Sequence, residues 1–186
     1  MTTLALENHH RVRARRHRTP TSVHPEQLDA AAGSLTVTAL RPGDVDTVAQ
    51  VFRGLSPKSS RMRFHAATPR LTASALRLLA AVEPGRHEVL VASLLGRPVG
   101  LARWVRDRND RTSAEVALEV VDTEHRHGIG AELARRIVLA ARRAGVRTLT
   151  AEIHAENRVV RDWALSWGFR APLRHTDPYV LSLDPR

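Results

Sequence analysis

Two glycines stand where an apolar, β-branched run gives way to a long helical pattern. The run ends at Val121, a short charged link follows, and Gly128-Ile129-Gly130 opens a segment rich in alanine, leucine and arginine. Glycine lets the backbone approach a ligand closely, and the first turn of a helix offers unpaired N–H groups at the positive end of its dipole. This spacing therefore predicts a cradle for an anion, best suited to a phosphate or pyrophosphate.

Two carboxylates lie on the strand pattern that leads into these glycines. Glu115 and Glu119 fall on one face with Ala117 between them, because side chains alternate along a strand. Buried carboxylates are costly unless they are paired, so this is not a core pattern. If the face lines a pocket, the two carboxylates could attract a cation and accept its proton. The alternative is a salt-bridged or solvated sheet face, given the many arginines nearby.

Several other chemistries are excluded by residues that the chain lacks. It has no cysteine, which excludes disulfides, thiolate metal sites and a cysteine nucleophile. No Gly-x-Ser-x-Gly elbow is present, no Gly-Lys-Ser/Thr completes a phosphate-binding Walker loop, and Leu133 stands where a dinucleotide fingerprint needs its third glycine. No spacing of histidine, aspartate and glutamate demands a metal, so we expect none.

Apolar periodicity predicts the elements that must position these groups. Antiparallel hairpins in the middle of the chain and strand–helix–strand crossovers near its end indicate an α/β fold. We expect a mixed, mostly antiparallel central sheet of six to seven strands flanked by helices. The predicted strands are 35–39, 89–92, 99–105, 113–121, 149–154, 169–173 and 179–183, and the predicted helices are 45–52, 58–65, 72–82, 130–144 and 157–167.

Composition indicates one domain behind a basic tail. A chain of 186 residues with 42% hydrophobic content can fill a single core, which we place in residues 34–186. Residues 1–33 are basic and lack apolar periodicity, so we expect a disordered extension there. Without a membrane-spanning or signal-peptide stretch, we expect a soluble, cytoplasmic protein. The net charge of +10 could recruit nucleic acid, but only 4% of residues are aromatic, which disfavours base stacking.

The layout and motifs over about residues 35–183 resemble the GNAT superfamily of acetyl-CoA-dependent N-acyltransferases. Residues 125–130 match the pyrophosphate loop of that family at both glycines, although His125 replaces its usual Gln or Arg. Residues 156–158, followed by Trp167-Gly168-Phe169, look like the helix beside the pantetheine arm. Residues 55–64 look like the opening segment of GNAT domains in bacterial protein lysine acetyltransferases.

This resemblance implies acetyl-CoA as co-substrate and assigns residues to it. Backbone amides of the loop would hold the pyrophosphate. A backbone N–H at the end of the preceding strand would polarise the thioester carbonyl. In the family, a bulge splays the sheet at this point. Asn157 would cap its helix, reach the cofactor arm, or do both. The implied cofactor-binding residues are Val120, Val121, Arg126, His127, Gly128, Ile129, Gly130, Ala131 and Asn157.

The resemblance also implies the catalytic groups. Glu115 falls where protein-acetylating relatives carry their general base, and Glu119 would bind the substrate cation or share the work. Many family members protonate the leaving thiolate with a tyrosine, but Ala164 stands at that position here. The protein-acetylating branch also lacks this tyrosine, so its loss does not exclude catalysis. The expected acceptor is an amine, first a protein lysine and next a small amine.

Two readings from other functional classes stay open. The missing tyrosine and His125 favour a non-catalytic acyl-CoA-binding sensor that docks a partner through residues 1–33. A nucleic-acid binder driven by arginine is the weaker alternative. We expect no membrane partner, and a homodimer is compatible with the sequence.

Overall fold

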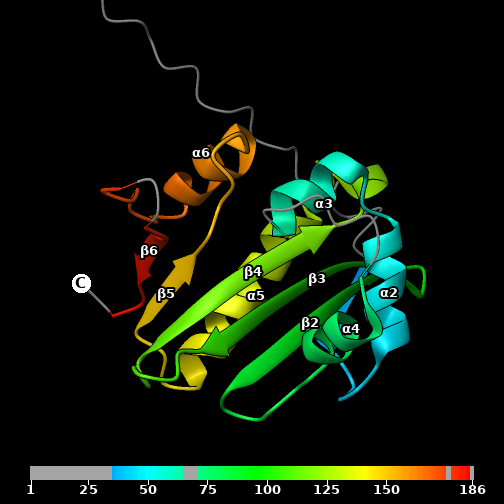
Figure 1. The fold of residues 1–186 in the computed structure, drawn as a ribbon, viewed down its shortest axis with the longest axis horizontal. Coiled ribbons are helices and arrows are strands. Elements are labelled where there is room, and N and C mark those ends of the chain that lie inside the picture. The colour runs from blue at the N-terminus through cyan, green and yellow to red at the C-terminus, as the bar shows by residue number, and fades with distance from the viewer. Residues whose placement is uncertain (1–34, 65–70, 175–176, 185–186) are drawn as a thin grey trace, which may run out of the picture.

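The computed structural model describes residues 35–64, 71–174 and 177–184, so the predicted basic extension lies outside the described residues. The chain forms a six-stranded sheet with helices on both faces (Figure 1). The strands are β1 (Leu35–Ala39), β2 (His87–Leu94), β3 (Arg97–Arg106), β4 (Ser113–Val120), β5 (Thr148–Ala151) and β6 (Tyr179–Ser182). The helices are α2 (Val45–Arg53), α3 (Pro57–Phe64), α4 (Ala73–Leu79), α5 (Ile129–Arg143) and α6 (Arg158–Ser166), with a 3₁₀ turn, η1, at Asp122–Glu124.

The sheet confirms the predicted mixed, mostly antiparallel topology. Its strands lie in chain order from β1 to β6, and β4 pairs with β5 in parallel while the other neighbours are antiparallel. The parallel pairing joins Ser113–Glu115 to Thr148–Thr150 and goes no further along β4. Beyond Glu115 the two strands therefore separate. We call the gap beside residues 116–120 the β4–β5 fork.

The expected bulge on β4 is absent from the register between β3 and β4. That pairing runs without a shift from Arg106↔Ala114 to Gly100↔Val120. The irregular register lies instead in the pairing of β2 with β3, where Ala92 pairs with Gly100 and Ser93 with Pro98, so that Val99 of β3 is the extra residue. The sheet opens at the fork because the pairing with β5 ends, and not because β4 itself is distorted.

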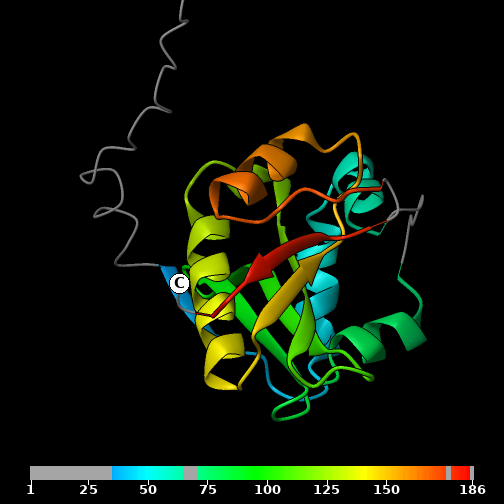
Figure 2. The ribbon, with the colours of Figure 1, turned by 90° about the vertical axis from the view of Figure 1, so that its left-hand side faces the viewer.

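Helices cover the two faces of the sheet from opposite sides, as the turned view shows (Figure 2). Helix α5 packs on β2, β3 and β4 through a buried stripe, and α2 packs on β3 from the other face. The stripe consists of Ile129, Leu133, Ile137 and Ala141, which are buried, whereas Ala140 is only partly buried. Among the described residues, no helix is long and apolar enough to cross a membrane.

The predicted strand at residues 169–173 does not form. That segment makes one isolated bridge, between Arg170 and Val180 of β6, before the chain leaves the sheet. Pro172 lies inside the predicted strand and has no N–H to donate to a ladder, so the pairing cannot continue. Of the two predicted C-terminal strands, the structure contains only β6 among the residues it describes.

Gly54 ends α2 against the C-terminal end of β4, where a side chain would not fit. A Cβ built on Gly54 would lie 2.8 Å from the Cβ of Val121, and the Gly54 carbonyl accepts a hydrogen bond from the Asp122 N–H at 3.1 Å. Gly54→Ala should therefore lower the free energy of unfolding by about 1–3 kcal/mol, the usual cost of overpacking.

Chemical denaturation measures this change against a matched glycine variant. Gly130→Ala is the control, because its Cβ would lie 3.8 Å from the nearest side-chain atom and alanine favours a helix. It should not lower stability. A Gly54→Ala protein as stable as the wild type would contradict the predicted clash.

Candidate active site

The N-terminus of α5 lacks the side-chain cap that the other described α-helices possess. Asp44, Ser56, Thr72 and Asn157 each accept a hydrogen bond from a backbone N–H in the first turn of α2, α3, α4 and α6, respectively. Gly128, the N-cap of α5, has no side chain to do so. The first amides of a 15-residue helix are thus left for another partner. This arrangement fits the predicted anion cradle.

Two residues in the loop before α5 have a left-handed backbone conformation, which changes the direction of the neighbouring amides. Arg126 has a φ of 67° and Gly128 a φ of 78°. A left-handed conformation costs a residue with a side chain about 1–2 kcal/mol, and such strain tends to persist at functional sites. Successive amides around left-handed residues form concave anion sites. Arg126 and His127 are exposed and add a guanidinium and an imidazole beside the cradle.

His125 ties the loop back to the end of β4. Its Nε2 lies 2.8 Å from the carbonyl oxygen of Val120. Because a carbonyl only accepts hydrogen bonds, this Nε2 carries the proton. The residue that departs from the family pattern therefore has a local role, which is to hold the loop against the strand.

Val120 and Val121 present their amides to opposite edges of β4. The Val121 N–H donates to the Val99 carbonyl of β3 at 2.9 Å. Successive N–H groups of a strand alternate between its two edges, so the Val120 N–H points away from β3, toward the β4–β5 fork. Of the two amides proposed to polarise the thioester carbonyl, only that of Val120 faces the fork.

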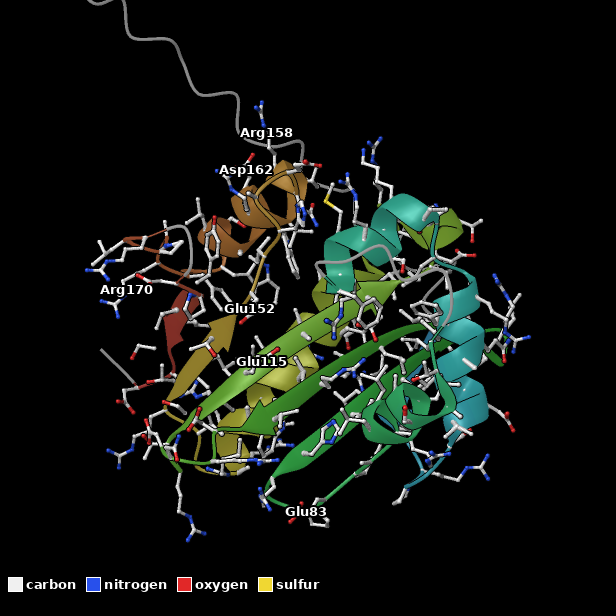
Figure 3. The ribbon with its side chains drawn as sticks, viewed as in Figure 1. Glu83, Glu115, Glu152, Arg158, Asp162 and Arg170 are labelled. Carbon is white, nitrogen blue, oxygen red and sulfur yellow. The ribbon has the colours of Figure 1, made fainter. Side chains whose placement is uncertain are left out.

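Glu115 lies at the point where β4 and β5 separate. It is exposed and lines a hollow of about 390 Å³ together with Thr150 and Glu152 of the β5 side. Glu115 lies on β4, and Glu152 directly follows β5 (Figure 3). Among the described residues, no guanidinium group forms an ion pair with the Glu115 carboxylate. An exposed carboxylate free of a cation is available to accept a proton.

Glu119 has a different environment, although it shares a face with Glu115. Its Oε2 accepts from Arg63 Nε at 2.7 Å and its Oε1 accepts from Arg103 at 2.6 Å. Burial alone would raise the pKa of the Glu119 carboxyl, but the charges of Arg103 and Arg63 and their hydrogen bonds outweigh burial and hold this pKa below its usual value. The salt-bridged alternative thus describes the state of Glu119 here.

Asp122 fastens α3 to the loop that leads into α5. Its two carboxylate oxygens accept from the Ser56 N–H and the Ser59 hydroxyl, both at 3.0 Å. Burial opposes ionisation of Asp122, yet these hydrogen bonds and the nearby His125 lower the pKa of the carboxyl. No motif in the sequence indicates the contacts of Asp122, Arg63 or Arg103. A lone arginine inside an apolar strand, as at Arg103, is the signal that could have indicated a buried ion pair.

The last helix confirms the predicted cap and shows what stands in place of the family tyrosine. Asn157 Oδ1 accepts from the Val160 N–H at 3.3 Å. Ala164 is buried and offers no hydroxyl, and Tyr179 is buried in β6. Among the described residues, no group of three or more histidine, aspartate or glutamate side chains is placed to hold a metal ion.

Comparison with solved structures finds this fold in acetyltransferases. The GNAT domain of PAT from S. lividans has a TM-score of 0.72 at 22% identity, covering 79% of this chain and 89% of that domain. The structure of yncA from Salmonella typhimurium with its cofactor acetyl-CoA has a TM-score of 0.65 at 20% identity, covering 82% and 95%. Likenesses at these identities establish the fold alone.

Sequence comparison establishes the family. Acetyltransferase Pat from Mycolicibacterium smegmatis is 28% identical over 153 residues, which cover 81% of this chain but 46% of Pat, so the chain spans less than half the length of that relative. The sequence profile of the Acetyltransferase (GNAT) family matches residues 56–169, more than half of the chain. The glycine loop, the uncapped helix and the forked sheet thus stand in a chain that belongs to the acetyltransferase (GNAT) family.

Proposed function

We propose that this protein transfers an acetyl group from acetyl-CoA directly to an amine, in a complex that holds both reactants. The observation that carries this proposal is the uncapped N-terminus of α5 at one end of the β4–β5 fork, with the Glu115 carboxylate, which forms no ion pair among the described residues, at the other end. The uncapped helix N-terminus is suited to bind a pyrophosphate, and the carboxylate is suited to act as a general base. The fork between them is open along one edge of β4.

The loop and the first turn of α5 would hold the pyrophosphate of coenzyme A. The amides from Arg126 to Ala131 are the donors, and Arg126 adds positive charge, while the His127 ring lies beside them, 3.4 Å from the Glu124 carboxylate. Glu132, the carboxylate in this turn, does not cancel that charge, because hydrogen bonds from Arg135 and Arg136 lower its pKa to about 2 and pair it with them. The donor set therefore fits a dianionic group.

The open edge of β4 would hold the pantetheine arm. Amides of alternate residues, such as Leu118 and Val120, face the fork, where β5 does not pair with them. An extended arm with amide groups can pair with such an edge as an added strand would. An arm that starts at the loop and follows β4 runs toward Glu115, which is about 16 Å from Val120 at 3.3 Å per residue. The arm and Glu115 would thus lie along the same edge of β4.

Glu115 would accept the proton of the acceptor amine. An alkylammonium with a pKa near 10 is almost wholly charged at neutral pH and cannot attack a carbonyl until it loses a proton. Glu115 is exposed and lines the hollow, and among the described residues no guanidinium forms an ion pair with it, although Arg106 and Arg108 line the same hollow. Glu119 is held by Arg63 and Arg103, so between the two carboxylates Glu115 is the base.

The leaving thiolate would take its proton from water. Ala164 has no acidic group, and the only tyrosine of the chain, Tyr179, is buried in β6. A thiolate is a good leaving group, so the missing tyrosine does not prevent transfer. Acetyl-CoA supplies the activated acyl group, and no metal takes part in this scheme.

The acceptor we propose is a protein lysine, with a small primary amine as the next choice. The exposed hollow at Glu115 gives an ammonium on a flexible chain direct access to the carboxylate. The opening segment at residues 55–64 and the likeness to Acetyltransferase Pat support the same class. The proposed setting is the cytoplasm, where acetyl-CoA is at hand.

A non-catalytic acyl-CoA sensor is the second candidate, favoured by the alanine at position 164. One experiment separates the two. Thermal unfolding is followed with and without acetyl-CoA, and thiol release is then measured with a lysine-containing peptide and with small primary amines. A raised Tm with amine-dependent thiol release supports transfer, and a raised Tm without release supports the sensor. An unchanged Tm and no release would contradict both.

A further inference from the structure

Helix α3 is attached to the protein by polar contacts and not by the hydrophobic core. Ser60 is its buried residue, and none of its side chains belongs to the main apolar cluster. Its aromatic residue, Phe64, makes an edge-on contact with Phe52 of α2, at 5.4 Å between ring centroids, and Met62 is partly buried. Three of its eight residues are basic and none is acidic. Something other than apolar burial must hold this helix in place.

Three polar ties join α3 to segments that border the proposed site. Asp122 binds its first turn to the loop before α5, Arg61 pairs with Glu156 before α6 at 2.8 Å, and Arg63 pairs with Glu119 of β4. Figure 1 shows α3 at the C-terminal end of β4, on the same side of the molecule as α6. Helix α3 thus lies beside the end of β4 that also leads into the fork.

The tie between Arg63 and Glu119 is the one shielded from water. The Glu119 side chain is 6% exposed and that of Arg63 is 20% exposed, whereas both partners of the Arg61–Glu156 pair are well exposed. Exposed pairs contribute little to stability, but breaking a buried pair leaves an uncompensated charge. Arg103 on β3 fixes Glu119 from the other side, so that Glu119 cannot turn away from Arg63.

We infer that Glu119 is a positioning residue, which through Arg63 holds α3 as the acceptor-side wall of the site. This inference rests on the proposed acetyl transfer, because it assigns α3 to the acceptor and not to acetyl-CoA. Glu119 does not take part in proton transfer; it sets where the acceptor chain can lie relative to Glu115. The excess of arginine over carboxylate in this cluster keeps Glu119 ionised and α3 docked.

Arg63→Met tests this role without burying an unpaired charge, since it leaves the Glu119–Arg103 pair intact. Amide hydrogen exchange in α3 should become about tenfold faster, as expected when a local docking contact is lost. The KM of the acceptor should rise about fivefold or more, with kcat and the acetyl-CoA affinity changed by less than about threefold. Arg63→Lys, which keeps the charge, should restore much of both effects.

Arg61→Met is the matched control, because it removes the same charge from the same helix but breaks an exposed pair. Its α3 exchange and acceptor KM should stay within about twofold of the wild type. Equal exchange in the two variants would overturn the inference, and so would a fall in kcat without a change in KM for Arg63→Met. If no amine is acetylated by the wild type, the exchange comparison still decides whether Glu119 docks α3, so that failure of the proposed function is distinguished from failure of this inference.

Discussion

Replacing Glu115 with glutamine is expected to lower kcat by about 10²- to 10⁴-fold at neutral pH, the range for loss of a general base. Glutamine keeps the size of the side chain and a carbonyl oxygen, but it cannot take a proton from the ammonium. Acetyl-CoA should bind the variant as tightly as the wild type, because Glu115 lies about 16 Å along β4 from the end that meets the loop. Initial rates and isothermal titration measure the two quantities.

The pH profile makes this prediction sharper. As pH approaches the pKa of the acceptor amine, near 10, the amine loses its proton to solvent and the advantage of the base shrinks. The activity ratio of wild type to Glu115→Gln should therefore fall steeply above pH 9. Glu152→Gln, which changes a neighbouring carboxylate of the same hollow, is the control and should keep most of kcat. Undiminished activity of Glu115→Gln would remove Glu115 as the base.

Local periodicity predicted most of the fold because the apolar pattern within each element largely determines whether it is a helix or a strand. The α5 stripe recurs every three to four residues, the helix ends at Arg143 just before Gly145, and the strand sequences that flank it alternate with a period of two. The segment at residues 169–173 alternates in the same way, yet only one bridge forms there. Pro172 disfavours a strand at this position, because it has no N–H to donate to a neighbouring strand.

The distinction between Glu115 and Glu119 could not be predicted from the strand that carries both. Because side chains alternate along a strand, both carboxylates lie on one face, and the pattern does not distinguish which of them could be catalytic. What separates them is Arg63, which is 56 positions away from Glu119 in the chain, and Arg103 on the neighbouring strand. Such a contact depends on how α3 packs on the sheet, and apolar periodicity carries no information about the docking of a polar helix.

The β4–β5 fork beside Glu115 likewise depends on how far β4 and β5 pair and not on the sequence pattern of β4. Residues 116–120 continue the apolar alternation of β4 without a break, and their register with β3 is regular. The opening arises because β5 ends at Ala151 and pairs only with the first part of β4. Where a partner strand ends cannot be read from the strand that it leaves.

Gly128→Asp is expected to weaken acetyl-CoA binding by about a hundredfold or more while the protein stays folded. The carboxylate would lie beside the first amides of α5, where it adds a negative charge to a site that must hold a pyrophosphate. It would also cap the helix, which contributes about 0.5–2 kcal/mol and offsets the strain of a side chain at a φ of 78°. The affinity for acetyl-CoA should thus fall much more than the stability of the fold.

Gly128→Asn separates the effect of the added negative charge from the effect of capping the helix. Asparagine tolerates the left-handed conformation and caps a helix as well as aspartate does, but it is neutral. It should occupy some of the first-turn amides and weaken acetyl-CoA binding by about tenfold, clearly less than Gly128→Asp does. Isothermal titration of both variants, with Tm as the check on folding, measures the difference. If Gly128→Asp binds acetyl-CoA like the wild type, the pyrophosphate does not lie at the start of α5, and the ligand must approach β4 from elsewhere.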